Sequence, residues 1–326
     1  MRLLLACGCA ALVLPAAALA TPSVSAFYYP WYGTPAVDGS WLHWSQNGHT
    51  PPANIASDYW PARGIYSSAD PVVLSSQLAE IKAAGIDQIV VSWWGQGSNE
   101  DERLPAVLAA ARRAGVAVAA HIEPYPGRTP AGVVGDIAYL RALGITSFFV
   151  YEPLDFSAAD WAAALEPLSG VQVYAQTPLV GFAAAGHFDG VYTYDVLVYG
   201  GDKFARICAE AHAVHLLCLP SVGPGYDAQA ATGDTRVKPR LNGATYDSMW
   251  RAAIAAHPDG ITITSFNEWH EGTQIEPAAP HPGSLSYEGA WGLTGRAAED
   301  AYLERTAYWS ARFHRLLGAR GAVSVR

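Results

Sequence analysis

Eight short apolar runs recur along the chain, separated by alanine-rich segments with helical spacing. Most of the runs are apolar throughout instead of alternating, as expected of strands that are covered on both faces. They begin at residues 23, 88, 116, 147, 171, 190, 215 and 260. Helices are predicted over residues 70–85, 104–115, 133–144, 158–168, 244–258 and 297–317. This strand–helix order predicts a single (β/α)8 TIM barrel with extended βα loops.

The first twenty residues have the pattern of an export signal. One Arg precedes an apolar stretch that ends in Ala18, Leu19 and Ala20. Residues 1–20 are therefore predicted to be a cleaved signal peptide, and residues 21–326 to be one mature domain. A membrane anchor fits less well, because Pro15 interrupts the short run. A lipoprotein signal at Cys7 would have too few residues before it. We expect a secreted or periplasmic protein.

The charge pattern excludes two classes of partner. The formal net charge is −9, and charged residues are spread along the chain without runs of like charge. Nucleic acids and anionic membrane surfaces both require clustered Lys and Arg, so neither is an expected partner. Aromatic residues are abundant, with 11 Trp and 17 Tyr. Such rings fill cores, and they also pack on the apolar faces of sugars.

Signal cleavage would leave two cysteines, Cys208 and Cys218. Two cysteines alone do not make a zinc site, and their spacing is not that of metal ligands. In an oxidising compartment they form a disulfide or remain as two buried thiols, and the sequence leaves both alternatives open.

The segment between the first predicted strand and the first predicted helix, residues 33–68, is unusually long. It is rich in Trp, Pro, Gly and His. Structureless loops of this length are uncommon in compact domains and are usually functional. We therefore expect this loop to serve the functional site.

The last predicted strand runs into "SFNEWHEGTQIEP", which holds three glutamates. In a TIM barrel the active site lies at the carboxyl ends of the strands. Glu268 and Glu271, three residues apart in a turn, can share one side and divide acid and base roles. The alternative is that one of them caps a following helix or pairs with Arg128 or Arg240. Glu276 is predicted to be structural, because the run moves away from the strand end.

Three histidines follow or flank strand ends. His43, His121 and His270 would together suit a metal, but neither H-E-x-x-H nor H-x-H occurs. Hydrogen bonding to a substrate is the favoured interpretation.

Two other pairs of strand-end residues have competing interpretations. Trp93 or Trp94 is either a sugar platform or a plug of the barrel core, and we expect one of them to be a platform. Glu123 and Glu152 each precede a proline at a strand end. One of these carboxylates binds a sugar hydroxyl, or each forms an ion pair.

Taken together, these strand ends resemble glycoside hydrolase family 99, the endo-α-1,2-mannosidases and endo-α-1,2-mannanases. The matching motifs are "FYYPWYG", "GIYSSADP", "VVSWWG", "HIEPYPGR", "FDGVYTYD", "PSVGPGYD" and "SFNEWHEGTQIEP". They span essentially the whole of residues 21–326 in the family's order. Such a set is far more specific than a shared barrel. The resemblance implies that residues 21–326 form a glycoside hydrolase catalytic domain.

The resemblance also implies a mechanism for the two carboxylates. The glutamates of the family's NEWHE motif map onto Glu268 and Glu271. The first acts as a base on the sugar's own 2-hydroxyl, which closes on the anomeric carbon to give a 1,2-anhydro sugar. The second protonates the leaving oxygen and later deprotonates the water that opens the ring. Configuration is retained without a covalent glycosyl-enzyme, unlike the usual two-carboxylate scheme.

By the same resemblance, an α-mannoside oligo- or polysaccharide is the expected partner, with no cofactor and no metal. The residues expected to bind it are Tyr29, His43, Trp94, His121, Tyr125, Arg128, Tyr194 and Asn267. The sequence departs from the family pattern at Trp60 and Arg63, which makes the subsite preference uncertain. Nothing in the sequence indicates an obligate oligomer, so a monomer is expected.

Two alternatives compete with a secreted retaining endo-α-mannosidase. One is a catalytically silent mannan-binding barrel, against which the intact pair Glu268 and Glu271 speaks. The other is the same chemistry on a different α-linked glycan. The sequence does not distinguish fungal mannan, a high-mannose glycan or a bacterial polysaccharide as the substrate.

Overall fold

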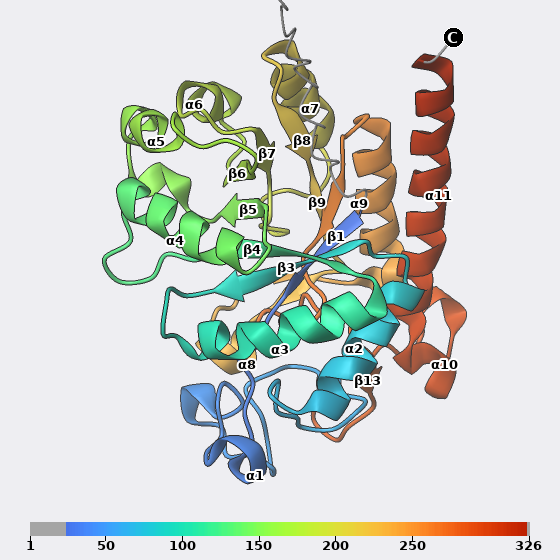
Figure 1. The fold of residues 1–326 in the computed structure, drawn as a ribbon. Coiled ribbons are helices and arrows are strands. Elements are labelled where there is room, and N and C mark those ends of the chain that lie inside the picture. The colour runs from blue at the N-terminus through green and yellow to red at the C-terminus, as the bar shows by residue number, and fades with distance from the viewer. Residues whose placement is uncertain (1–23, 325–326) are drawn as a thin grey trace, which may run out of the picture.

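The computed structural model describes residues 24–324, which form one nearly closed barrel of nine parallel strands surrounded by helices (Figure 1). The predicted signal peptide, residues 1–20, lies outside the described residues. Along the sheet the strands follow the order β8-β7-β6-β5-β4-β3-β1-β12-β9. Their bounds are β1 Val24–Tyr28, β3 Gln88–Trp93, β4 Ala117–Ile122, β5 Ser147–Val150, β6 Gln172–Gln176, β7 Gly190–Tyr192, β8 Leu217–Leu219, β9 Ser221–Val222 and β12 Ile261–Ile263.

All eight predicted strand runs lie in this sheet, and the seventh is divided into β8 and β9. The division falls at Pro220, which has no N–H to donate to a neighbouring strand. β8 pairs with β7, and β9 pairs with β12. The amide of Thr262 donates to the carbonyl of Pro220 at 3.1 Å. The two ends of the sheet are thus joined through one interrupted stretch of chain.

The predicted helices are present, some with shifted ends. They are α2 Pro71–Ala83, α3 Asn99–Ala114, α4 Pro130–Ala142, α5 Ala158–Leu165, α9 Ala244–Ala255 and α11 Ala301–Ser324. Ser98, Thr129 and Ser157 each accept a hydrogen bond at a helix N-terminus from a backbone amide. Two further helices, whose bounds the sequence did not predict, complete the outer layer: α6 Val180–Ala185 and α7 Phe204–Ala213. Among residues 24–324 no helix is long and apolar enough to cross a membrane.

Short helices and strands lie in the segments that connect the main elements of the barrel. The loop after β1 contains α1 Pro35–Asp38, η1 Gln46–Gly48 and β2 Trp60–Pro61, and β2 pairs with β13 Ala278–Ala279. A hairpin of β10 Tyr226–Asp227 and β11 Val237–Lys238 follows β9 and encloses α8 Gln229–Thr232. The remaining short elements are η2 Pro153–Asp155, η3 Leu241–Gly243, η4 Ala290–Gly292 and α10 Arg296–Glu299.

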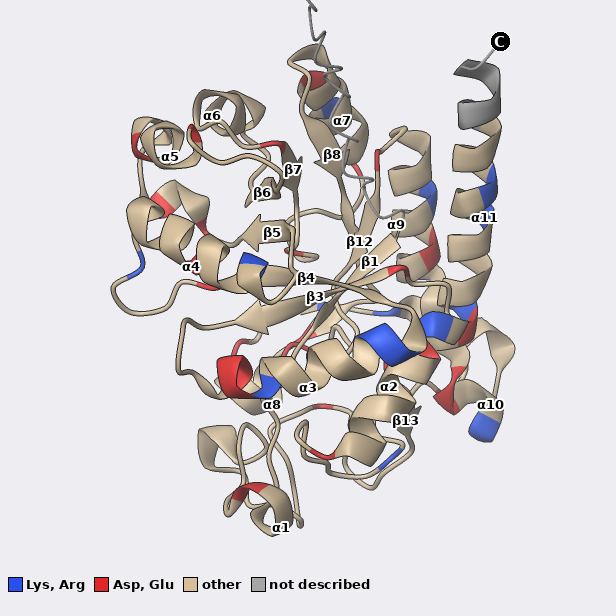
Figure 2. Ribbon diagram, viewed as in Figure 1, with Lys and Arg blue, Asp and Glu red and all other residues tan. Residues whose placement is uncertain are grey.

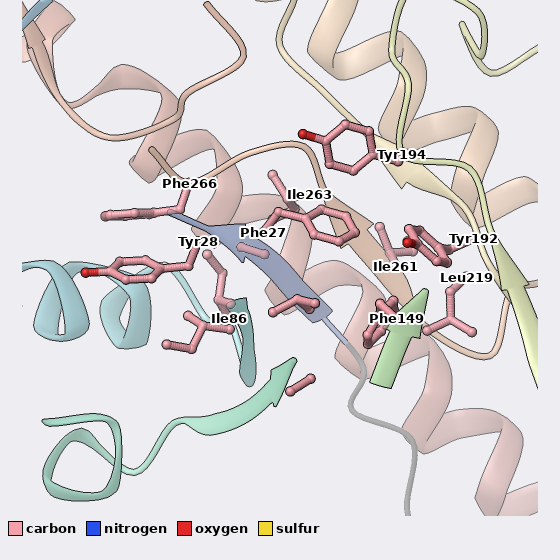
Figure 3. Packing of buried hydrophobic residues seen from close by; sticks show 14 of the residues in the cluster. Phe27, Tyr28, Ile86, Phe149, Tyr192, Tyr194, Leu219, Ile261, Ile263 and Phe266 are labelled. Carbon is pink, nitrogen blue, oxygen red and sulfur yellow. The ribbon is translucent and has the colours of Figure 1, made fainter. Parts of the chain in front are cut away.

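None of the nine barrel strands carries a Lys, Arg, Asp or Glu, and the charged residues lie on helices and connecting segments (Figure 2). Inside the barrel, Phe27 meets Phe149 and Tyr192 with ring centroids 6.0 Å and 5.7 Å away. The next residue, Tyr28, points outward and stacks on Phe266 (Figure 3). This alternation leaves both faces of β1 buried, which explains its unbroken apolar sequence.

Cys208 of α7 and Cys218 of β8 form a disulfide, which decides between the two alternatives that the sequence left open. The bridge ties an outer helix to the strand that follows it. Both residues are buried.

We expect this bridge to resist alkylation unless the protein is first reduced. A loop of ten residues implies that the disulfide stabilises the fold by about 2–3 kcal/mol in the chain-entropy account. The measurement is the intact mass of unreduced, alkylated protein lacking residues 1–20, together with denaturant unfolding with and without reductant. Two added alkyl groups on the unreduced protein would contradict the bridge.

Candidate active site

The segment that follows β12 folds back on itself into a compact loop. The amide of Ser265 donates to the carbonyl of Thr273, and the amide of Glu276 to the carbonyl of Phe266, at 2.9 and 2.8 Å. The Ser265 hydroxyl accepts a hydrogen bond from the amide of Glu268 at 2.8 Å. Hydrogen bonds made by Ser265 therefore close the loop, and one of them holds the backbone of Glu268 near the end of β12.

Gly272 lets this loop approach the hairpin of β10 and β11. Its φ is +61°, and a Cβ there would lie 2.7 Å from the carbonyl oxygen of Asp227. The amide of Asp227 donates to the carbonyl of Glu271 at 2.8 Å. Any other residue at position 272 would combine backbone strain with a backbone clash. The close approach holds the backbone of Glu271 in place.

Both predicted glutamates line a cavity of about 280 Å³ at the carboxyl ends of the strands, which we call the rim cavity. Its walls come from the segments that follow β1, β3, β4, β5, β7 and β12. The lining residues are Tyr29, Trp31, Trp94, His121, Glu123, Pro124, Tyr151, Glu152, Tyr194, Glu268 and Glu271. A mixture of aromatic rings and carboxylates suits a ligand with apolar faces and many hydroxyls.

A second cavity, the side cavity, lies next to the rim cavity and has a volume of about 150 Å³. The two share Tyr151, Tyr194 and Glu271 as lining residues. The side cavity extends toward Asp195 of the segment after β7 and toward Tyr226 of β10, with Val196, Leu197, Arg236 and Thr264 also lining it. Glu271 thus lines both cavities.

The two glutamates differ in their hydrogen-bond partners. Glu268 accepts from the amide of His270 at 2.9 Å, and the amides of His270 and Glu271 both favour its ionised form. Glu271 instead accepts from the hydroxyl of Tyr194 at 3.4 Å. The hydroxyls of Tyr194 and Tyr29 are hydrogen-bonded in turn. One carboxylate is therefore held by backbone amides and the other by a chain of two tyrosines.

Burial raises the pKa of both carboxyl groups. For Glu268, burial and then the charge of Glu271 raise the pKa well above its usual value. For Glu271, burial and then the charge of Asp195 raise the pKa to about 7. Two carboxylates that disfavour each other's charge tend to share a proton, so the pair suits a division into acid and base.

Neither glutamate forms the ion pair that the sequence left open. Arg128 donates to the carbonyls of Tyr151 and Glu152 at 2.6 and 2.9 Å. Arg240 donates to the carbonyls of Gly272 and Gln274, and three tyrosine rings surround its guanidinium. Glu268 and Glu271 do not begin a helix either, because their segment is a loop.

Several residues expected at the site do line the rim cavity, namely Tyr29, Trp94, His121 and Tyr194. Of the tryptophan pair, Trp93 is fully buried and donates to Asp101 at 2.9 Å, so it belongs to the core. Trp94 is the one that faces the cavity. Tyr194 is buried, which raises the pKa of its phenol well above 10 and keeps it a hydrogen-bond donor.

Four expected residues do not line either cavity, and each instead holds a neighbour in place. The side-chain amide of Asn267 accepts a hydrogen bond from the backbone N–H of Tyr29 at 2.8 Å and donates one to the Tyr29 carbonyl at 2.9 Å. Arg128 supports the segment of Glu152, as described above. The Tyr125 hydroxyl donates to Asp136. The ring of His43 stacks on Trp31 at 4.5 Å.

The two departures from the family pattern, Trp60 and Arg63, line neither cavity. Arg63 forms ion pairs with Glu276 and Glu80 at 2.7 and 2.5 Å. The ring of Trp60 stacks on His281, with centroids 3.7 Å apart. The structure therefore gives both residues supporting places behind the site.

Among the cavity-lining residues that sequence reasoning missed, four have aromatic or acidic side chains: Trp31, Tyr151, Asp195 and Tyr226. Each lies within four residues of the end of a barrel strand, so nearness to a strand end was the signal that could have found them. Glu123 is one of the two strand-end carboxylates whose role the sequence left open. It lines the rim cavity, and its Oε1 lies 2.9 Å from Nδ1 of His121.

The three histidines do not come together as a metal site. His43 and His270 stack with centroids 5.5 Å apart, whereas Nε2 of His121 lies 2.9 Å from the hydroxyl of Tyr192. Among the described residues, no group of three His, Cys, Asp or Glu side chains is arranged to hold a metal ion. Burial lowers the pKa of His270 to about 4, so the ring is neutral near pH 7.

A TIM barrel with paired carboxylates in an aromatic-lined cavity at its strand ends is the arrangement of a glycoside hydrolase, and this chain is one. Residues 20–315 match Glycosyl hydrolase family 99. The chain belongs to that family.

Relatives of known name support the assignment. A glycoprotein endo-alpha-1,2-mannosidase-like protein of Danio rerio is 35% identical over 355 residues, which cover 88% of this chain and 77% of that protein. The glycoprotein endo-alpha-1,2-mannosidase of Mus musculus is 31% identical, with 88% and 74% covered. The GH99 endo-alpha-mannosidase structure from Bacteroides thetaiotaomicron superposes with a TM-score of 0.81 and 31% identity, covering 91% of this chain and 98% of that one.

The raised pKa of Glu271 predicts a specific pH dependence of stability. In the folded protein its pKa is about 7 against an ordinary 4.5, so unfolding between these pH values releases a proton. Stability is therefore lost as pH rises from about 4.5 to 7, by up to about 1.4 kcal/mol per pH unit from this group. Glu271→Gln, which cannot ionise, is expected to gain stability relative to the parent across that window.

The measurement is urea unfolding of both proteins at pH 4.5, 6 and 7.5. The comparison leaves out the buried histidines, which are present in both proteins, and reports on Glu271 together with Glu268, whose pKa the charge of Glu271 raises. A stability difference that stays constant over the three pH values would show that the carboxyl of Glu271 has an ordinary pKa.

Proposed function

We propose that the chain is an exported, retaining endo-α-mannosidase that cleaves internal linkages of an α-mannan or high-mannose glycan. The meeting of the two cavities at Glu271 carries the endo-acting part of this proposal. Sugar units can occupy the rim cavity and the side cavity on either side of the bond to be cut. The names of the relatives support α-mannosidic linkages as the class of substrate.

In the proposed first step, Glu268 removes the proton of the sugar's 2-hydroxyl. The oxygen forms a bond to the anomeric carbon as the glycosidic bond breaks, and Glu271 gives its proton to the leaving oxygen. In the second step, Glu271 takes a proton from water, which attacks the anomeric carbon. The 1,2-anhydro ring opens, and its oxygen takes back the proton from Glu268. Two inversions leave the configuration unchanged.

These roles require the proton to rest on Glu271, although burial raises the pKa of Glu268 further. The hydrogen bonds of the two groups favour the required arrangement. Backbone amides already stabilise a negative charge on Glu268, and a sugar 2-hydroxyl would add another donor. Glu271 has the Tyr194 hydroxyl as its donor and faces both cavities, where an acid must meet the leaving oxygen.

Export is proposed on two grounds. Residues 1–20 have the composition of a signal peptide. The disulfide between Cys208 and Cys218 is of a kind that persists in oxidising compartments. Together they favour a secreted or periplasmic enzyme.

We expect Glu268→Gln and Glu271→Gln each to lower turnover by roughly 10²–10⁴-fold, the usual contribution of general acid–base catalysis. Binding of the glycan should be largely unchanged, because the side chains keep their shape. Initial rates on yeast α-mannan and calorimetric binding provide the measurement. Near-parental turnover in either variant would remove that residue from the mechanism, and the lack of turnover by the parent protein would favour the silent mannan-binding alternative.

The stereochemical course tests the proposed 2-hydroxyl participation. A donor with fluorine at C2 has no internal nucleophile, so it should bind without reacting and leave no adduct on the enzyme. The natural substrate should release an α product first. Proton NMR of early product and intact-protein mass give these readings. An early β product would overturn retention, whereas a stable adduct on Glu268 would keep retention and overturn the anhydro-sugar route.

A further inference from the structure

A second concave site lies outside the barrel, between the neighbouring helices α9 and α11 (Figure 1). We call it the outer groove. Its volume is about 400 Å³, which is within the range of small-ligand sites. It is lined by Arg251 and Ile254 of α9 and by Arg305, Tyr308, Trp309 and Arg312 of α11.

The outer groove concentrates positive charge in a protein whose net charge is −9. Asp247 of α9, an acidic residue beside the groove, is paired with Arg305, which donates two hydrogen bonds to it at 2.6 and 2.5 Å. Arg251 reaches Asp247 only at 3.4 Å, and its side chain is 63% exposed. Among the described residues Arg312 has no ion-pair partner. The groove therefore keeps an excess of positive charge (Figure 2).

The groove also presents an aromatic surface beside these charges. Tyr308 is 48% exposed, and the guanidinium carbon of Arg305 lies 4.6 Å from the centre of its ring. Trp309 is buried beneath, with the guanidinium carbon of Arg251 at 5.7 Å from its ring. The hydrogen bond from the indole of Trp309 to Asp247, at 2.7 Å, fixes the floor. Arg305 and the two rings are thus held in place before a ligand arrives.

We infer that the outer groove binds an acidic sugar, a pyranose that carries a phosphate or a carboxylate. The acidic group would meet Arg251 and Arg312, whose planar guanidinium groups match such oxyanions. The apolar face of the sugar ring would pack on Tyr308.

The catalytic cavities do not suit such a ligand. Five carboxylates, those of Glu123, Glu152, Asp195, Glu268 and Glu271, line the rim and side cavities against the single arginine Arg236. An anion that entered there would meet like charge. The outer groove is therefore a separate site, and its binding does not depend on the proposed hydrolysis.

The test is isothermal titration of the mature protein with mannose 6-phosphate, glucuronic acid, mannose and inorganic phosphate at low and at 0.15 M salt. We expect at least one acidic sugar to bind more tightly than either mannose or inorganic phosphate, and salt to weaken it. The two acids distinguish a phosphate from a carboxylate ligand. Turnover of yeast α-mannan is measured on the same proteins and should be unchanged by substitutions in the outer groove, so a failure of this inference and a failure of the proposed function give different results.

Two groove variants and one matched control locate the site. Arg251→Gln with Arg312→Gln is expected to weaken acidic-sugar binding by roughly tenfold or more, the loss of about one charge-assisted hydrogen bond. Tyr308→Ala should weaken the acidic sugar but not inorganic phosphate. Arg112→Gln with Arg113→Gln, which removes the same charge from exposed positions of α3, should leave binding unchanged.

The inference is overturned if no acidic sugar binds, if inorganic phosphate binds as tightly as the acidic sugars, or if the groove substitutions leave acidic-sugar binding unchanged. Equal weakening in the groove variant and in the α3 control would also overturn it, because net charge alone would then explain the binding. Melting temperatures of the groove variants and of the α3 control should match that of the parent, since the changed side chains are exposed or half-exposed.

Discussion

The fully buried carboxylate of Glu276 is the contact on which the geometry of the site depends. It accepts hydrogen bonds from Arg63 at 2.7 Å, Gln77 and Tyr66 at 2.8 Å, and the indole of Trp269 at 2.9 Å. The donors come from the long loop after β1, from α2 and from the loop that bears the two candidate catalytic glutamates. Leaving such buried donors unpaired typically costs about 1–3 kcal/mol each, so the three segments are held to one arrangement.

The same contacts also fix the loop that lines the rim cavity. Trp269 lies between Glu268 and Glu271 in the chain, so fixing its indole limits how the loop on either side can turn. Its amide receives a further constraint, because it donates to the hydroxyl of Tyr32 at 2.9 Å. Asn267 then ties the same loop to the backbone of Tyr29. Two carboxyl groups with raised pKa values are thereby kept buried by contacts made behind them, and the cavity face stays open to substrate.

The sequence predicts the barrel well because its strands are buried on both faces and their apolar runs are unmistakable. It predicts α6 and α7 poorly, since α6 is short and neither helix has a side-chain cap at its N-terminus. It also places Glu268, Glu271 and Tyr194 correctly at the rim cavity. Motif membership alone does not show which residues face the cavity, as Trp94 does, and which hydrogen-bond to nearby backbone carbonyls, as Arg128 does.

The reason for that limit is physical. Asn267 and Arg128 use their donors on carbonyl groups, and such partners depend on where a loop runs and not on side-chain identity. Arg63 is an example in which the sequence suggested a place at the site and the fold gives another one. As a departure from the family pattern it suggested an altered subsite, yet its partners, Glu276 and Glu80, come from a distant loop and a helix. Only the fold brings those charges together.

Charge is distributed over the molecule in a way that bears on what it can bind. Near the strand ends, Arg128 and Arg240 are buried and donate to carbonyls, and Arg63 pairs with carboxylates. Exposed arginines beside an aromatic ring lie instead on the outer face of α9 and α11. The chain thus separates a cavity lined by carboxylates from a basic, aromatic surface outside the barrel.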